Sequence, residues 1–152
     1  EEIAEMTVLA ASHIRRFGID PKAALLSHSN FGSRETATAR KMRDALAVLR
    51  AMEVTFEVDG EMHGDAALSV AMRAKAMPDS PLQGEANLLV FPTLDAANIA
   101  LNLLKSMTDA LHVGPILLGC AKSAHIVTPS VTSRGIVNIS ALAAVEANSD
   151  TA

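Results

Sequence analysis

Short apolar runs alternate along this chain with longer segments in which apolar residues recur every three or four positions. The runs predict strands, and because most of them are apolar throughout, they predict strands buried on both faces. The longer segments predict amphipathic helices. We therefore expect an α/β fold, with a mainly parallel sheet covered by helices on both faces in three layers. The expected strands are residues 23–26, 55–58, 88–91 and 115–118, and the expected helices are residues 3–17, 36–52, 64–77, 94–108 and 132–146.

Length and composition limit the classes of protein to which this chain can belong. Its 152 residues suffice for one domain, and 49% apolar residues indicate a globular core. No apolar run approaches the roughly 20 residues of a membrane span, so no membrane partner is expected. A net charge of −4 without Trp or Tyr argues against nucleic acid as a partner. The single cysteine, Cys120, cannot form an internal disulfide, and it favours a cytoplasmic location.

The first residues indicate a piece cut from a longer protein. The chain opens at Glu1 without an initiator methionine and is already in helical periodicity. The sequence does not open with a charged segment followed by an apolar run, so no signal peptide is expected. The alternative is a small protein that has been processed.

The loop of residues 27–33 is the first candidate site. It follows the expected strand 23–26, and ligands of open α/β sheets bind at the carboxyl ends of strands. Free backbone amides and the dipole at the N-terminus of the next helix favour an anion there. Ser29, Asn30 and Ser33 add hydroxyl and amide donors, and Gly32 allows a ligand to approach the backbone closely. The alternative is an ordinary turn between a strand and a helix.

Acidic residues and a histidine gather between residues 59 and 65. Asp59, Glu61, His63 and Asp65 could bind a divalent metal ion or act in acid–base chemistry. Their spacing matches no EF-hand and no zinc-protease motif, so we expect no metal site. The preferred interpretation is a turn at the end of a strand, followed by the first turn of a helix that carries Asp65.

A lysine follows the last expected strand. Lys122 comes soon after Gly119, where the strand 115–118 should end, so we expect it near the loop of residues 27–33. A lysine there could bind a phosphate group, and the alternative is a solvated surface side chain. His13 lies on the apolar face of the first expected helix and is expected in the core. No nucleophile-elbow motif is present, so no Ser-His-Asp triad is expected.

Short motifs follow one another in a fixed order along the chain. They are KAALLS at 22–27, SHSNFG at 27–32, DGE at 59–61, DAA at 65–67, PDSP at 78–81, GEAN at 84–87, FPTL at 91–94, ANI at 97–99, GPI at 114–116 and IVN at 136–138. Together they resemble the C-terminal part of phosphate acetyltransferases over essentially the whole chain. The sequence of the loop, SHSNFG, resembles one branch of the family above all, the phosphotransacetylase-like region of bacterial NADP-dependent malic enzymes.

One segment departs from the pattern of active phosphate acetyltransferases. That family carries a lysine, then a Ser-Arg-Gly sequence, and then an Asp directly before Ile-Val. Lys122 and Ile136-Val137 keep the overall spacing without a gap, which aligns Thr128–Ser130 with the Ser-Arg-Gly and Gly135 with the Asp. Pro129 then has no charge with which to bind an acyl phosphate, and Gly135 has no side chain to accept a proton.

The resemblance implies a domain without catalytic residues of its own. It implies a regulatory and assembly role in an NADP-dependent malic enzyme, which converts malate to pyruvate and CO2, with acetyl-CoA as the allosteric effector. It implies no cofactor within this chain, and NADP and a divalent metal ion in upstream domains. The residues expected to bind acetyl-CoA or phosphate are Ser29, Asn30, Gly32, Ser33, Lys122, Thr128 and Ser130.

The resemblance also assigns boundaries and partners. Residues 1–121 would form most of the second phosphotransacetylase subdomain, without its first strand, and residues 122–152 a C-terminal return segment and helix. The partners would be the upstream malic enzyme domains and a second copy of the chain, paired through the helix that carries Ala97, Ala100, Leu101 and Leu104.

Two alternatives stay open. One is an active phosphate acetyltransferase fragment, in which Ser133-Arg134-Gly135 takes the place of the lost motif after a compensating insertion and deletion in the alignment. The other is a purely structural oligomerisation module. An acyl-transfer assay would separate the first alternative from the regulatory role, and titration with acetyl-CoA would separate the second.

Overall fold

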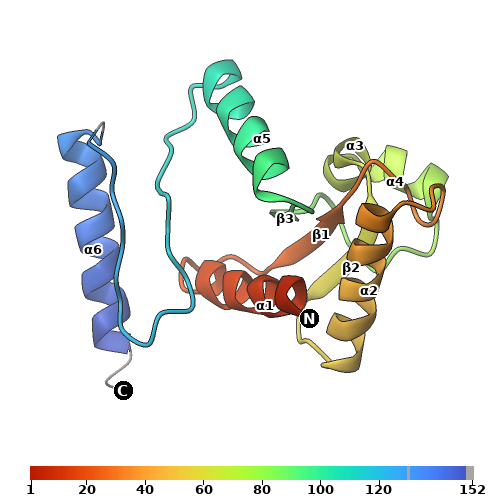
Figure 1. Cartoon of the computed structure of the whole chain (residues 1–152), viewed down its shortest axis with the longest axis horizontal. Helices are drawn as coiled ribbons and strands as arrows, with labels where there is room; N and C mark the ends of the chain where they lie inside the picture. The colour runs from red at the N-terminus through yellow and green to blue at the C-terminus, as the bar shows by residue number, and fades with distance from the viewer. Residues whose placement is uncertain (130, 150–152) are drawn as a thin grey trace. The chain divides into compact units, whose positions relative to one another are not determined.

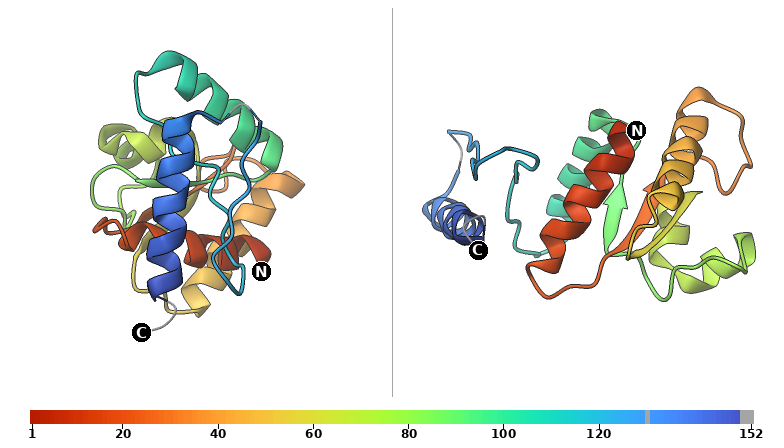
Figure 2. Two further views of the ribbon diagram at one scale, coloured as in Figure 1. Left: turned by 90° about the vertical axis from the view of Figure 1, so that its left-hand side faces the viewer. Right: turned by 90° about the horizontal axis from the view of Figure 1, so that it is seen from below.

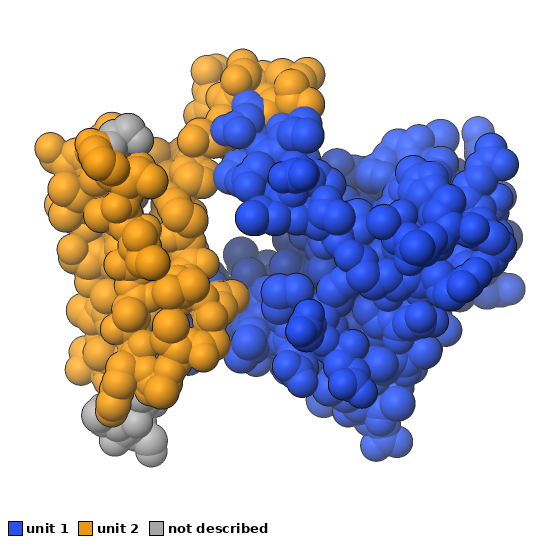
Figure 3. Space-filling view, viewed as in Figure 1, with its two compact units in different colours: residues 1–102 blue, residues 103–152 orange. Residues whose placement is uncertain are grey.

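The computed structural model describes residues 1–129 and 131–149. Two compact units make up the chain, Glu1–Asn102 and Leu103–Ala152 (Figure 3). The elements in chain order are α1 (Glu2–Arg15), β1 (Lys22–Leu26), α2 (Ala37–Ala51), β2 (Glu57–Met62), α3 (Gly64–Leu68), α4 (Val70–Ala76), β3 (Leu88–Val90), α5 (Leu94–Met107) and α6 (Ser133–Ser149).

Three parallel strands form the sheet of the first unit, in the order β2–β1–β3 (Figure 1). Ala23 of the central strand pairs with Val58 on one side and with Leu88 on the other. Strand β1 is buried from Ala23 to Leu26, because it has a neighbour at each edge and helices above and below. The apolar run that predicted a doubly covered strand is therefore confirmed.

Helices cover both faces of this sheet (Figure 2). Successive side chains of a strand point to opposite faces. Leu25 belongs to a core cluster with Met42 and Leu49 of α2, whereas Leu26 belongs to a second cluster with Ala66 of α3. The predicted α/β fold, with a parallel sheet and helices on both faces, is confirmed.

Helix α2 follows its predicted apolar face, whereas α1 does so only in part, because Met6 and Leu9 on its predicted face are exposed. Met42 and Leu49 of α2 are fully buried. At the N-terminus of α2, Thr36 Oγ1 accepts a hydrogen bond from the Ala39 amide at 3.3 Å, which is the usual way to cap a helix. In α1, His13 is buried, as predicted. Thr36 follows the candidate loop by only a few residues, so this cap fixes where the chain enters α2 after the loop.

Strand β2 differs from its prediction. It covers Glu57–Met62 instead of residues 55–58, so Asp59 and Glu61 lie inside a buried strand, and the predicted turn at this point is wrong. Gly60 serves the close approach of two strands: a Cβ at this position would come within 2.8 Å of Leu25 Cβ.

Two further elements differ from their predictions. The expected helix 64–77 is two helices, because the backbone of Ser69 is extended (φ −136°, ψ 113°) and its Oγ caps the start of α4. Residues 115–118 form no strand within the described part of the chain. Apolar composition alone does not make a strand, since a strand also needs a neighbour to which its backbone can bond.

The second unit joins an irregular segment to α6. Glu146 of α6 accepts hydrogen bonds from Ser123 Oγ at 2.7 Å and from His125 Nε2 at 3.0 Å. Ile139 and Leu142 of the same helix are buried. Across residues 1–129 and 131–149, no helix combines the length and the apolar character needed to cross a membrane.

Candidate functional site

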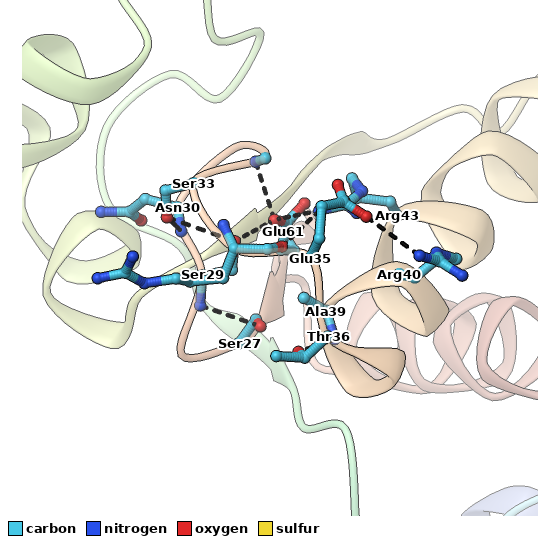
Figure 4. A network of polar contacts seen from close by, with 12 residues as sticks. Ser27, Ser29, Asn30, Ser33, Glu35, Thr36, Ala39, Arg40, Arg43 and Glu61 are labelled. Atoms are coloured by element: carbon cyan, nitrogen blue, oxygen red, sulfur yellow. Dashed lines mark hydrogen bonds and ion pairs between the residues drawn. The ribbon is translucent and has the colours of Figure 1, made fainter.

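The candidate loop of residues 27–33 folds back over the end of β2 (Figure 4). The Ser27 amide donates to the Met62 carbonyl at 2.8 Å, and the Phe31 amide donates to the Glu61 carbonyl at 2.7 Å. The loop leaves β1, and β1 and β2 are parallel neighbours. One site is therefore built at the carboxyl ends of two adjacent strands, where ligands of open α/β sheets bind.

A single buried carboxylate lies at the centre of this loop. Glu61 is 0% exposed, and its Oε1 accepts hydrogen bonds from Ser29 Oγ (2.6 Å), the Gly32 amide (2.9 Å) and Arg43 Nη1 (3.1 Å). Ser29 and Gly32 belong to the loop, and Arg43 belongs to α2 (Figure 4). The Glu61 side chain thus joins β2, the loop and α2 at one point.

These contacts keep Glu61 ionised. Burial raises the pKa of the Glu61 carboxyl, but the hydrogen bonds from Ser29, Gly32 and Arg43 together lower it by more, so the pKa lies below its usual range. The other carboxylate oxygen, Oε2, is buried and has no hydrogen-bond partner among the residues that the structure describes. The charge is therefore stabilised through Oε1, by charge-assisted hydrogen bonds.

The other amides of the loop also donate within the protein. The Asn30 amide donates to Ser33 Oγ at 2.9 Å, the Ser33 amide to the Asn30 carbonyl at 3.0 Å, and the Arg34 amide to Ser29 Oγ at 3.0 Å. These loop amides are therefore not free for a ligand, because the carboxylate of Glu61 and the loop's own oxygen atoms accept them. Contacts between the loop and a ligand stay a prediction.

The outer side of the loop presents polar groups to solvent. Gly32, Ser33 and Arg34 are exposed, and Asn30 is half-buried. Asn30 is held by His63, whose amide donates to Asn30 Oδ1 at 2.7 Å. Within the described residues, the Arg34 guanidinium forms no ion pair. Arg34 was not among the predicted site residues, although a cation beside a Gly-Ser pair at a helix N-terminus is itself a signal for an anion site.

Ionic contacts continue from Glu61 to the surface (Figure 4). Arg43 Nη2 lies 2.6 Å from Glu35 Oε1, and Arg43 Nη1 also donates to the Arg34 carbonyl at 3.2 Å. Arg40 approaches the other oxygen of Glu35 at 3.3 Å. Arg43 therefore binds both the buried carboxylate and the exposed end of the loop.

Sequence signals for these residues are unequal. The alternation of apolar Phe56, Val58 and Met62 with acidic residues continues through Glu61, so a longer strand would have been the better interpretation of this segment. Nothing in the sequence indicates that Arg43 reaches Glu61, because the two residues lie on separate elements whose packing brings them together.

The neighbouring acids have separate roles. Asp59 is buried, and it accepts hydrogen bonds from Ser80 Oγ at 2.6 Å and from Arg50 Nη2 at 3.3 Å. Asp65 lies in the first turn of α3, as predicted. In the part of the chain that the structure describes, no group of three or more His, Cys, Asp or Glu side chains could hold a metal ion.

A pocket of about 300 Å³ adjoins the loop on the side of α2. Arg43, Arg50, Asp59 and Asp79 are among its lining residues. Glu61 also lines it, so its arginines are matched by carboxylates and it offers no excess of positive charge to an anion. The exposed side of the loop suits an anionic ligand better.

The other predicted site residues belong to the second unit. Lys122 and Thr128 are exposed, and Ser130 lies outside the described residues. Their part in a site shared with the loop stays a prediction. Gly135 lies in the first turn of α6, where a Cβ would come within 2.8 Å of Val131 Cγ2. A carboxylate side chain at this position would therefore require Val131 to move.

Comparison with known proteins identifies the family. The profile of the phosphate acetyl/butaryl transferase family matches residues 1–144. A phosphotransacetylase from Streptococcus pyogenes superimposes with a TM-score of 0.90 at 33% identity, over 97% of this chain and 45% of that chain. The EutD phosphotransacetylase from Staphylococcus aureus gives 0.87 at 33% identity, over 95% of this chain and 45% of that chain. This chain belongs to the phosphate acetyl/butaryl transferase family.

Two kinds of protein are similar in sequence. The NAD-dependent malic enzyme of Rhizobium meliloti (strain 1021) is 66% identical over 148 residues, which are 97% of this chain and 19% of that protein. The NADP-dependent malic enzyme of Escherichia coli (strain K12) is 53% identical over 97% of this chain and 20% of its own length. The phosphate acetyltransferase of Paracoccus denitrificans is 40% identical over 95% of this chain and 46% of its own length. The predicted resemblance to both kinds is confirmed, and the chain spans only part of each.

Proposed function

We propose that this chain is a regulatory and assembly domain of a malic enzyme, that it binds acetyl-CoA, and that it transfers no acyl group itself. The proposal that the chain is part of a malic enzyme is supported by its 66% identity with a malic enzyme, against 40% with a phosphate acetyltransferase, over nearly the same length. The parent would oxidise malate to pyruvate and CO2, with a divalent metal ion in its upstream domains. NADP is the expected nucleotide, although relatives named for NAD and for NADP both match.

The proposed contact for acetyl-CoA is the exposed side of the loop. Asn30, Ser33 and Arg34 offer amide, hydroxyl and guanidinium groups there, and the phosphate groups of a coenzyme A ester suit such donors. In this proposal Lys122 supplies further charge from the second unit, and Thr128 and Ser130 supply hydroxyl groups. Ser29 and Gly32 contribute to the shape of the loop through their bonds to Glu61.

The absence of acyl transfer rests on two positions. Pro129 and Gly135 stand where active relatives are expected to carry an arginine and an aspartate, and neither can bind an acyl phosphate by charge or accept a proton. The crowding at Gly135 by Val131 fits a position without a side chain. An assay of acetyl transfer between acetyl phosphate and CoA should detect no turnover in the intact protein, and turnover like that of an active phosphate acetyltransferase would refute this part.

The second candidate is an active phosphate acetyltransferase fragment. The family match over residues 1–144 favours it, and so does the exposed Arg134 in the first turn of α6. If this candidate is correct, Arg134→Gln should abolish the acyl transfer that the wild type would show. The matched control Arg16→Gln changes an exposed arginine outside the candidate residues and should keep that transfer.

Self-association is the third part of the proposal. Helix α5 has no buried residue, and Leu101 and Leu104 are 39% and 52% exposed on it. We propose that a second copy of the chain covers this helix, in a closed two-fold dimer. Leu104→Glu should shift the protein toward smaller species in equilibrium sedimentation at micromolar concentration. A wild type that is monomeric at micromolar concentration would contradict the proposed self-association.

Regulation can be tested by enzyme kinetics. Acetyl-CoA should change the apparent malate affinity of the intact enzyme by a factor that corresponds to about 1–3 kcal/mol, the usual size of coupling between two sites. Lys122→Ala should remove the change, and Lys75→Ala, an exposed lysine in α4, should keep it. Malate kinetics that are the same with and without acetyl-CoA would leave only the structural role.

A further inference from the structure

One charged side chain of the candidate site is not accessible to a ligand. Glu61 is fully buried and ionised, yet it lies beneath the loop and not on its exposed side. Two of its three donors, Ser29 Oγ and the Gly32 amide, come from the loop that would receive the ligand. A buried charge is costly unless it is paired, so its presence calls for a structural reason.

We propose that Glu61 is the positioning residue of this loop: its carboxylate occupies the inner side of the loop as a built-in anion and holds Ser33 and Arg34 outward for the ligand. This inference rests on the proposed binding of acetyl-CoA only for its functional consequence. The positioning itself follows from the contacts within the first unit.

The geometry ties the loop at both ends. At the start of the loop, Ser29 donates to Glu61 and accepts from the Arg34 amide. At the end, Arg43 bridges Glu61 and the Arg34 carbonyl. The carboxylate is thus bonded to the residue before Asn30, to Gly32 and to the helix that follows the loop. Without it, a buried hydroxyl and a backbone amide would lose their acceptor.

Glutamine at position 61 separates charge from shape. Because Oε2 has no hydrogen-bond partner in the described residues, a glutamine can place its Nε2 there and keep its carbonyl oxygen at the position of Oε1. Glu61→Gln therefore keeps the volume and one acceptor, and removes the charge that strengthens the bonds from Ser29, Gly32 and Arg43. The glutamine also buries two Nε2 hydrogens without an acceptor, so the pH dependence of the loop is what separates a charge effect from a packing effect.

Hydrogen exchange of the intact protein, read in peptides that cover residues 28–36, is the direct test. Glu61→Gln should raise the hydrogen-exchange rate of these amides about tenfold or more, since a hydrogen bond to a charged group is worth more than one to a neutral group. Glu85→Gln, which changes an exposed glutamate in the same unit, should leave the rate unchanged. Ser29→Ala is the second variant, because it removes one donor and keeps the charge.

The pH dependence separates a charge effect from a packing effect. After correction for intrinsic exchange, wild-type protection of residues 28–36 should be constant above the usual pKa of a glutamate and fall as the Glu61 carboxyl is protonated. In Glu61→Gln the same peptides should show no such fall. Equal protection of this loop in the wild type, Glu61→Gln and Ser29→Ala at neutral pH would overturn the inference.

Binding is measured separately on the same proteins. Glu61→Gln should weaken acetyl-CoA binding in calorimetry about tenfold, whereas Glu85→Gln should not. If the wild type binds no acetyl-CoA, the proposed function fails and the exchange result still decides the positioning role. If the wild type binds and Glu61→Gln binds equally well, the loop's shape is not what the ligand needs, and the functional consequence of the inference fails alone.

Discussion

Each of the two units contains a buried glutamate that accepts a hydrogen bond from a serine. Glu61 pairs with Ser29 and with Arg43 in the first unit, and Glu146 pairs with Ser123 and with His125 in the second. The difference lies in the second partner: an arginine is always charged, whereas a histidine can be neutral.

The surroundings of the two glutamates differ as well. Glu61 also accepts from the backbone of a loop, at Gly32, and it lies at the edge of a parallel sheet where ligands bind. Glu146 bonds to side chains of an irregular segment and holds that segment to α6. One carboxylate is therefore bonded within a candidate binding loop, while the other holds a segment to a helix.

The largest expected effect is that of Glu61→Ala. The substitution removes the acceptor of a buried hydroxyl and a backbone amide and leaves Arg43 without its inner partner, so the first unit should lose about 3 kcal/mol of stability. Native-state hydrogen exchange in peptides of β1 and β2 measures this loss. Glu85→Ala, which truncates an exposed glutamate of the same unit, should stay within about 0.5 kcal/mol of the wild type.

Acid should weaken the first unit through the same carboxylate. Since the pKa of Glu61 is lowered in the folded protein, its stabilisation is fully present above the unfolded value of about 4.3 and is lost as the pH falls through the lower folded value. The difference in unfolding free energy between wild type and Glu61→Gln should be about 2 kcal/mol at pH 7 and shrink below pH 4. A difference that is the same at both ends of this range would contradict the ionised state.

Glu146→Gln should have a smaller effect, of about 1 kcal/mol, on the exchange of α6 peptides. The glutamine keeps one acceptor for Ser123, and a histidine such as His125 can be neutral, unlike the arginine that pairs with Glu61. A loss larger than that caused by Glu61→Gln would reverse the comparison between the two units. The exposed residue Ser140→Ala serves as the control within the same helix.

The smallest expected effects come from the two serines. Ser29→Ala should cost the first unit about 1 kcal/mol, because it removes a donor to an ionised group and an acceptor for the Arg34 amide. Ser123→Ala should cost the second unit less, since it removes one bond from a less buried position. Equal losses, again read by hydrogen exchange, would remove the distinction between the two serines.

The sequence pattern of a single segment was enough to predict some of the elements. The apolar run of β1 and the helical period of α2 were sufficient, because burial on both faces and burial on one face leave different periods in a sequence. The strand predicted at 115–118 shows the limit, since its apolar residues have no paired neighbour among the described strands.

The position of the candidate loop could be predicted, and its interior could not. A loop of small polar residues after a buried strand marks the carboxyl edge of a sheet, so residues 27–33 were found from the sequence. Glu61 and Arg43 were missed because their contacts with the loop join residues far apart in the chain. A glycine beside Glu61 also favoured a turn, whereas the structure uses Gly60 to bring β2 close to β1.

The most direct test of the central claim is a calorimetric titration of the intact protein with acetyl-CoA. We expect saturable binding to the wild type, an affinity weakened in both Ser33→Ala and Lys122→Ala, and an affinity unchanged in Ser12→Ala and Lys75→Ala, which alter exposed residues elsewhere. If the effect on malate is one of affinity, malate should shift acetyl-CoA binding by the same factor. Wild-type protein that takes up no acetyl-CoA, or unchanged affinity in both Ser33→Ala and Lys122→Ala, would contradict the central claim.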